Sequence, residues 1–145
     1  MNTIDILKKF PFKQLEGQID AQSKSEFECQ FRKFFSTPTA KSAANCVYVW
    51  YTQKPIHRLK DLSNIIYIGK TSQSLHARHA GYAAVEANDS NFARYHHIIS
   101  NFGPIKVYYC ECDKPEAREK ELLEMYFQNH LETPPINMSR KRKVR

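Results

Sequence analysis

The chain has 145 residues, the size of one ordinary domain, and its 22 Lys and Arg against 15 Asp and Glu give a formal net charge of +7. This charge favours a polyanionic partner, nucleic acid above all, over a cationic one. The lack of an apolar run of about 18 residues argues against a membrane span, and four cysteines without CxxC spacing and no signal-peptide pattern predict reduced thiols in a cytoplasmic protein.

Residues 1–44 predict an N-terminal helical arm. Within it four phenylalanines repeat at helical spacing, i, i+4, i+7 and i+8: Phe27, Phe31, Phe34 and Phe35. Ser36-Thr37-Pro38 ends the pattern. Such a stripe packs either against the rest of the domain or against a second copy of the chain, so a homodimer through the arm is one of two expectations.

Two segments after the arm have the composition of buried strands. Cys46–Thr52 and Asn64–Gly69 are rich in Val, Ile, Tyr and Trp. The stretch between them, Gln53–Ser63, predicts a mobile loop. Three basic side chains of this loop are candidates for contacts with a DNA backbone: His57, Arg58 and Lys60. A loop that is simply solvated is the commoner alternative.

The remainder predicts two helices, a strand and a last helix. Residues 72–86 and 92–99 have helical character, 104–112 form a strand, and 113–131 form a helix that Thr133-Pro134-Pro135 terminates. The order predicts an α+β domain, residues 45–139, in which helices flank a small three-stranded sheet with antiparallel pairing. A basic tail, residues 140–145, follows.

The tail carries five of the positive charges, four of which are candidates for DNA binding: Arg140, Lys141, Arg142 and Lys143. Three interpretations remain open for it. It is an arm that grips phosphates, a patch like a nuclear-localisation signal, or a solvated end.

Five short motifs occur in a particular order: CVYVWYT, IIYIGKT, LHAR, LLEMYF and PPIN. With these motifs residues 46–138 resemble the GIY-YIG nuclease family. The matching positions are Tyr48, Tyr67, Gly69, Arg78, Tyr82, Glu124 and Asn137. The leading glycine of the first tripeptide is absent, and Arg78 comes one residue later than the commonest spacing. The resemblance implies a small phage-type or restriction-type DNA endonuclease that depends on Mg²⁺ or Mn²⁺.

The resemblance also implies a role for each matching residue. Tyr48 would orient or deprotonate the attacking water, Tyr67 and Tyr82 would hold the phosphate or the water network, and Arg78 would clamp phosphate oxygens. Glu124 would hold a single metal ion. Glu121 is the rival ligand one turn earlier.

Three more residues are expected to support this chemistry. Lys70 is the candidate for the positive charge that favours the Tyr48 phenolate, because free tyrosine is a poor base at neutral pH. Gly69 fits a sharp backbone turn close to the substrate. Asn137 would anchor the segment after the last helix.

Three alternatives to a general endonuclease stay open. The fold could serve as a protein-interaction module, for which only the N-terminal Phe stripe could provide an exposed apolar patch. The other two involve nucleic acid. One is a repair or recombination nuclease that cuts a particular DNA structure. The other is a nucleic-acid-binding protein that kept the fold and lost activity, although a chain without catalytic function would be free to lose Arg78 or Glu124.

Overall fold

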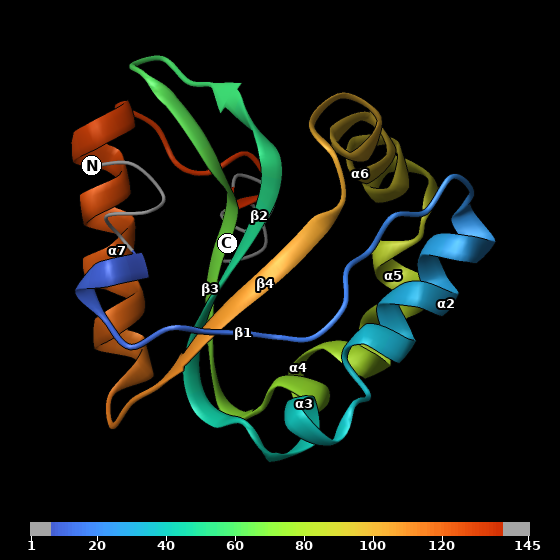
Figure 1. The fold of residues 1–145 in the computed structure, drawn as a ribbon, viewed down its shortest axis with the longest axis horizontal. Helices are drawn as coiled ribbons and strands as arrows, with labels where there is room; N and C mark the ends of the chain where they lie inside the picture. Colours follow the sequence, from blue (N-terminus) through green and yellow to red (C-terminus); the bar gives the residue numbers. More distant parts are fainter. Residues whose placement is uncertain (1–6, 138–145) are drawn as a thin grey trace.

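The computed structural model describes residues 7–137, which form an α+β fold around one antiparallel sheet (Figure 1). The strands lie in the order β1-β4-β2-β3. They are β1 (Lys13–Gln14), β2 (Ala44–His57), β3 (Leu62–Ser74) and β4 (Ile105–Glu111). The helices are α2 (Lys24–Phe34), α3 (Pro38–Ser42), α4 (Leu75–His79), the 3₁₀ helix η1 (Ala80–Tyr82), α5 (Ala83–Glu86), α6 (Asp89–Phe102) and α7 (Pro115–His130).

The predicted α+β class is confirmed, but the sheet has four strands rather than three. The additional strand, β1, pairs antiparallel with β4 through Lys13 opposite Tyr109 and Gln14 opposite Tyr108. The backbone N–H of Leu15 continues the contact by donating to the Val107 carbonyl at 2.9 Å. Because β1 has only two residues, it is too short for the alternating pattern by which a strand is predicted from sequence.

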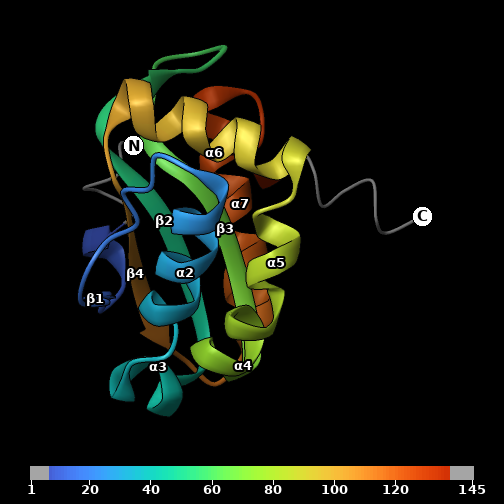
Figure 2. The same cartoon turned by 90° about the vertical axis from the view of Figure 1, so that its right-hand side faces the viewer.

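Helices cover both faces of the sheet, with α7 on one side and α2 and α4 to α6 on the other (Figures 1 and 2). Successive side chains of a strand point to opposite faces, so β2 contributes to two cores. Val47 and Val49 pack with Leu122 of α7. Tyr48 and Trp50 face the opposite layer of helices. Each helix of residues 7–137 is too short or too polar to serve as a membrane span.

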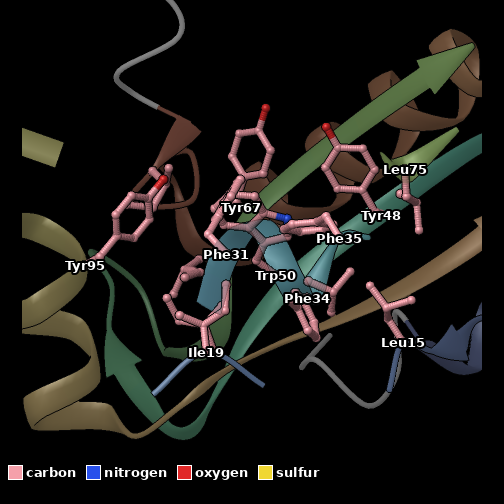
Figure 3. Close-up of a cluster of buried hydrophobic side chains, with 14 of the residues drawn as sticks. Leu15, Ile19, Phe31, Phe34, Phe35, Tyr48, Trp50, Tyr67, Leu75 and Tyr95 are labelled. Atoms are coloured by element: carbon pink, nitrogen blue, oxygen red, sulfur yellow. The ribbon is translucent and has the colours of Figure 1, made fainter. Parts of the chain in front are cut away.

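The phenylalanine stripe of α2 is part of this second core (Figure 3). All four rings are at most 5% exposed. Phe27 stacks on Tyr95 at 4.8 Å between ring centroids, and Phe31 meets Trp50 edge-on at 6.1 Å. The stripe therefore packs against the domain, and the boundary predicted at residue 44 does not separate two cores. A homodimer built on these rings would have no exposed surface to use.

The predicted loop, Gln53–Ser63, is largely a hairpin. β2 continues to His57 and β3 starts at Leu62, so only residues 58–61 form the connection. The guanidinium of Arg58 donates to the Thr133 carbonyl at 2.9 Å and pairs with Glu132 at 2.8 Å. The backbone N–H of Lys60 donates to the His130 carbonyl at 3.2 Å. These contacts fix the hairpin tip to the end of α7, which corrects the expectation of a mobile loop.

Candidate active site

Four of the predicted site residues meet in one cavity of about 540 Å³ beside β3. They are Tyr48, Tyr67, Arg78 and Tyr82. Tyr48 and Tyr67 come from the adjacent strands β2 and β3, with ring centroids 6.0 Å apart. Their hydroxyl groups point to the same side (Figure 3). Arg78 reaches the cavity from α4, a short helix whose N-cap Ser74 accepts a hydrogen bond from the Ala77 N–H.

Gly69 makes room for Tyr48. The two residues are direct partners across β2 and β3. A Cβ atom on Gly69 would lie 2.6 Å from two ring carbons of Tyr48 and 2.7 Å from its hydroxyl oxygen. The only glycines with positive φ among the described residues are Gly17 and Gly103. Gly69 is thus required for the close approach of an aromatic ring, and the expected sharp backbone turn is wrong.

Both tyrosines of the pair are neutral in the free protein. Burial, followed by the proximity of Tyr67, raises the pKa of Tyr48 well above its usual value. Burial likewise raises the pKa of Tyr67. Arg78 opposes these effects by lowering the pKa of both phenols. The cation that favours a phenolate here is therefore Arg78, whereas the sequence predicted Lys70.

Arg78 also contacts Tyr82. The guanidinium carbon lies 5.5 Å from the centre of the Tyr82 ring, which is a cation–π distance. The Tyr82 residue is 52% exposed. The ring therefore stands at the mouth of the cavity and holds the arginine from the solvent side.

A second cavity, of about 620 Å³, adjoins the first and shares Tyr67 and Arg78 with it. Lys70, Glu119 and Asn137 also line this cavity. Burial raises the pKa of Glu119, while Lys70 and, more weakly, Arg78 lower it. In turn, Glu119 raises the pKa of Tyr48 and of Tyr67. Glu119 is therefore a carboxylate that shares the electrostatic environment of both tyrosines and the arginine. Glu86 is a second one: it lines the first cavity and raises the pKa of Tyr67, and it accepts a hydrogen bond from the Tyr95 hydroxyl.

Glu124, the predicted metal ligand, lies elsewhere on α7. It is exposed and lines a hollow of about 1320 Å³ that meets the second cavity at Lys70 and Glu119. It lines neither cavity that contains Tyr67. The rival, Glu121, is exposed and forms ion pairs with Lys9 at 3.8 Å and Arg118 at 3.6 Å. The geometry favours Glu119 over both.

The phase of the helix explains why Glu119 faces the site. Leu122, Tyr126 and His130 are buried at four-residue spacing and define the side of α7 that packs on the sheet. Glu119 precedes Leu122 by three residues and lies on nearly the same side. Glu124 follows Leu122 by two residues and points away. The periodicity of α7 therefore favours Glu119, whereas the motif LLEMYF predicts Glu124.

Asn137 anchors the segment after α7 to β3. Its side-chain oxygen accepts from the Ile68 N–H at 2.9 Å, and its amide nitrogen donates to the Ile68 carbonyl at 2.9 Å. The preceding residue, Ile136, donates its N–H to the Ile66 carbonyl. The sequence predicted an anchoring role for Asn137, and the structure shows that it pairs with the sheet edge next to Tyr67.

The predicted DNA-contacting residues divide into three groups. His57 and Lys60 are exposed on the hairpin. The Arg58 side chain is only 10% exposed and is occupied by its contacts to the end of α7. This geometry argues for a structural role for Arg58, not the predicted contact with DNA. Arg140, Lys141, Arg142 and Lys143 lie outside the described residues.

Residues 7–137 contain no group of three or more His, Cys, Asp or Glu side chains that could hold a metal ion. Of the two carboxylates that line the cavities, Glu86 already accepts a hydrogen bond from the Tyr95 hydroxyl, so the candidate donor is Glu119. One carboxylate in a polar cavity fits a hard cation such as Mg²⁺, which usually keeps several waters and takes further oxygen ligands from a bound phosphate.

The chain was compared with protein-family models, with curated proteins and with solved structures, and none of the three comparisons gives a match.

Proposed function

We propose that the protein is a metal-dependent endonuclease that hydrolyses phosphodiester bonds of DNA. The observation that carries the proposal is the convergence of Tyr48, Tyr67, Arg78 and Glu119 at two adjoining cavities. Phosphodiester hydrolysis needs an oriented water, neutralisation of charge on the phosphoryl oxygens and stabilisation of the leaving alkoxide. These four side chains can supply or support each of these requirements.

Arg78 binds the scissile phosphate in this mechanism. It lies between the two cavities, and its planar guanidinium can donate two parallel hydrogen bonds to non-bridging oxygens. The Tyr82 ring restrains it from the solvent side. Arg78 therefore positions the phosphorus atom next to the hydroxyl groups of Tyr48 and Tyr67.

Tyr48 acts first as a neutral group. Because its pKa is raised, its hydroxyl orients the attacking water through a hydrogen bond and does not remove a proton from it in the free protein. Tyr67 lies beside it and lines both cavities. As the water oxygen bonds to phosphorus, the bond to the 3′ oxygen breaks, and one proton of the water ends on the departing 3′ oxygen, which becomes a hydroxyl group.

Glu119 would hold the Mg²⁺ or Mn²⁺ ion. The ion would supply positive charge to the phosphate and to the departing oxygen. Its charge would also favour ionised tyrosine over neutral tyrosine. With one such site in each chain, each encounter cuts one strand.

Cleavage of supercoiled plasmid tests this proposal, with Mg²⁺, with Mn²⁺ and with EDTA. Arg78→Ala and Glu119→Gln are expected to lower the rate at least about 100-fold, because each removes charge stabilisation at the reacting phosphate. Glu121→Gln, on the same helix but paired away from the site, is the matched control and should cleave like the wild type. Glu124→Gln distinguishes the two candidate ligands and is expected to retain most activity.

Two results would contradict parts of the proposal. If Glu124→Gln abolished cleavage and Glu119→Gln did not, the metal ligand would be Glu124. If folded wild-type protein bound DNA with no metal-dependent cleavage, the chain would be a nucleic-acid-binding protein of this fold.

A further inference from the structure

The cavity beside Tyr48 has an aromatic interior that the proposed hydrolysis does not use. Its deepest residues include Phe31, Trp50, His79 and Tyr95, each at most 4% exposed. Trp50 lies 5.0 Å from Tyr67 and 6.0 Å from Tyr95 between ring centroids. These buried rings form an apolar floor, so stacking on a planar ligand falls to the exposed Tyr82 ring of the same cavity. Base–aromatic stacking is the common means of holding unpaired bases.

Besides the hydroxyl oxygen of Tyr48, two deep polar atoms of residues that line this cavity have no hydrogen-bond partner among the described residues. They are the indole nitrogen of Trp50 and Nε2 of His79. Nδ1 of His79 lies 2.8 Å from the Leu75 carbonyl oxygen and must carry the proton in that contact. Nε2 of the neutral ring is then an acceptor, whereas the Trp50 N–H is a donor. A base edge offers donors and acceptors side by side and can satisfy both atoms.

The size and the rim of the cavity fit one nucleotide. Its volume of about 540 Å³ lies within the usual range for small-molecule sites, about 300–1,000 Å³. Tyr82 and Val85, both at least 44% exposed, lie at its mouth. Arg78 lines the same cavity, so a phosphate bound there would place the attached base at this mouth.

We propose that the cavity receives one unstacked base next to the bond that is cut, and that the preferred substrate is DNA with an unpaired nucleotide. The inference rests on the proposed endonuclease function for the position of the phosphate. Removing a base from a duplex costs stacking and pairing energy, and this cost is smallest for a base that is already unpaired.

The test uses the full chain, EDTA to prevent cleavage, and two DNA probes of the same flanking sequence. One probe is a duplex with a single-nucleotide bulge, and the other is fully paired. We expect about tenfold tighter binding to the bulged probe, the size of effect expected from one gained stack. Trp50 is the only tryptophan of the chain, so its emission should be quenched by the bulged probe alone.

Two substitutions at equally exposed positions distinguish an effect of the cavity from the general effect of an added negative charge on DNA binding. Val85 at the mouth is 44% exposed, and Leu62 on the hairpin is 43% exposed. Val85→Glu should reduce the preference for the bulged probe to near onefold, while Leu62→Glu should leave the preference unchanged. Equal affinity of wild type for both probes, with unchanged Trp50 emission, would overturn the inference, and so would a full preference in Val85→Glu.

Addition of Mg²⁺ distinguishes this inference from the proposed function. Cleavage without a preference for the bulged probe would support the endonuclease function and refute the binding of an unstacked base in the cavity. Preference and quenching without cleavage would support the base site and refute the endonuclease.

Discussion

At the scale of single residues, the contact between Gly69 and Tyr48 limits what can replace the glycine. Gly69→Ala would place its methyl group 2.6 Å from a Tyr48 ring that is completely buried. Because the added methyl group overlaps the ring and forces it to shift out of its buried position, we expect a loss of about 1–3 kcal/mol in the free energy of unfolding. Urea denaturation measures this loss of stability. The plasmid assay should show reduced DNA cleavage by the same variant. Gly81→Ala is the control, since no atom lies within 4 Å of its new Cβ and its stability should change little.

His79 is a second residue with a measurable consequence, because burial lowers its pKa to about 3. Its ring stacks on Phe35 at 3.8 Å and stays neutral in the folded protein. The unfolded chain takes up the proton near pH 6.5, so stability is full above that pH and falls as the pH decreases toward 3. Between pH 7 and pH 5 we expect the wild type to lose about 2 kcal/mol more than His79→Phe. Urea denaturation at the two pH values measures the loss of each protein. If the wild type and His79→Phe lost the same free energy of unfolding between pH 7 and pH 5, His79 would not have the lowered pKa.

At the scale of elements, the sequence predicts the range of a strand or helix well where the element is long and periodic. It fails where pairing with another strand sets the range. β4 and α7 lie close to their predicted ranges. The helix predicted over residues 72–86 is divided, because β3 continues to Ser74 and three short helices, α4, η1 and α5, then follow. Pairing with β2 extends β3 to Ser74, since Ala44 is its partner there. A local pattern contains no information on that partner.

The hairpin between β2 and β3 gives a prediction at the same scale. Arg58→Met should lower the free energy of unfolding by about 2 kcal/mol, because it removes charge-assisted hydrogen bonds of a largely buried side chain. Amide exchange should become faster at Leu59 and Lys60. The control is Lys60→Met, which removes the same charge from an exposed position. Lys60→Met should preserve stability and weaken DNA binding. If instead Arg58→Met weakened DNA binding and left stability unchanged, Arg58 would be a DNA contact.

At the scale of the whole molecule, part of the candidate site was predictable from the order of motifs. Tyr48, Tyr67 and Arg78 lie together because β2, β3 and α4 follow one another with short connections. The carboxylate was harder to predict, since α7 packs on the other face of the sheet and reaches the site only along the side that carries Glu119. The deep cavity could not be predicted, because α2 and α6 enclose Trp50 from distant parts of the sequence.

The continuity of the core across residue 44 gives the last prediction. A chain of residues 45–145 would lack β1 and the α2 rings that cover Trp50 and His79. Because one large aromatic removed from a core already costs about 3–5 kcal/mol, we expect this chain to lose cooperative thermal unfolding and to expose apolar surface. A peptide of residues 7–44 added in trans should restore cooperative unfolding, as followed by near-ultraviolet circular dichroism. Cooperative unfolding of residues 45–145 alone, with a monomer in light scattering, would show that the N-terminal segment is a dispensable arm.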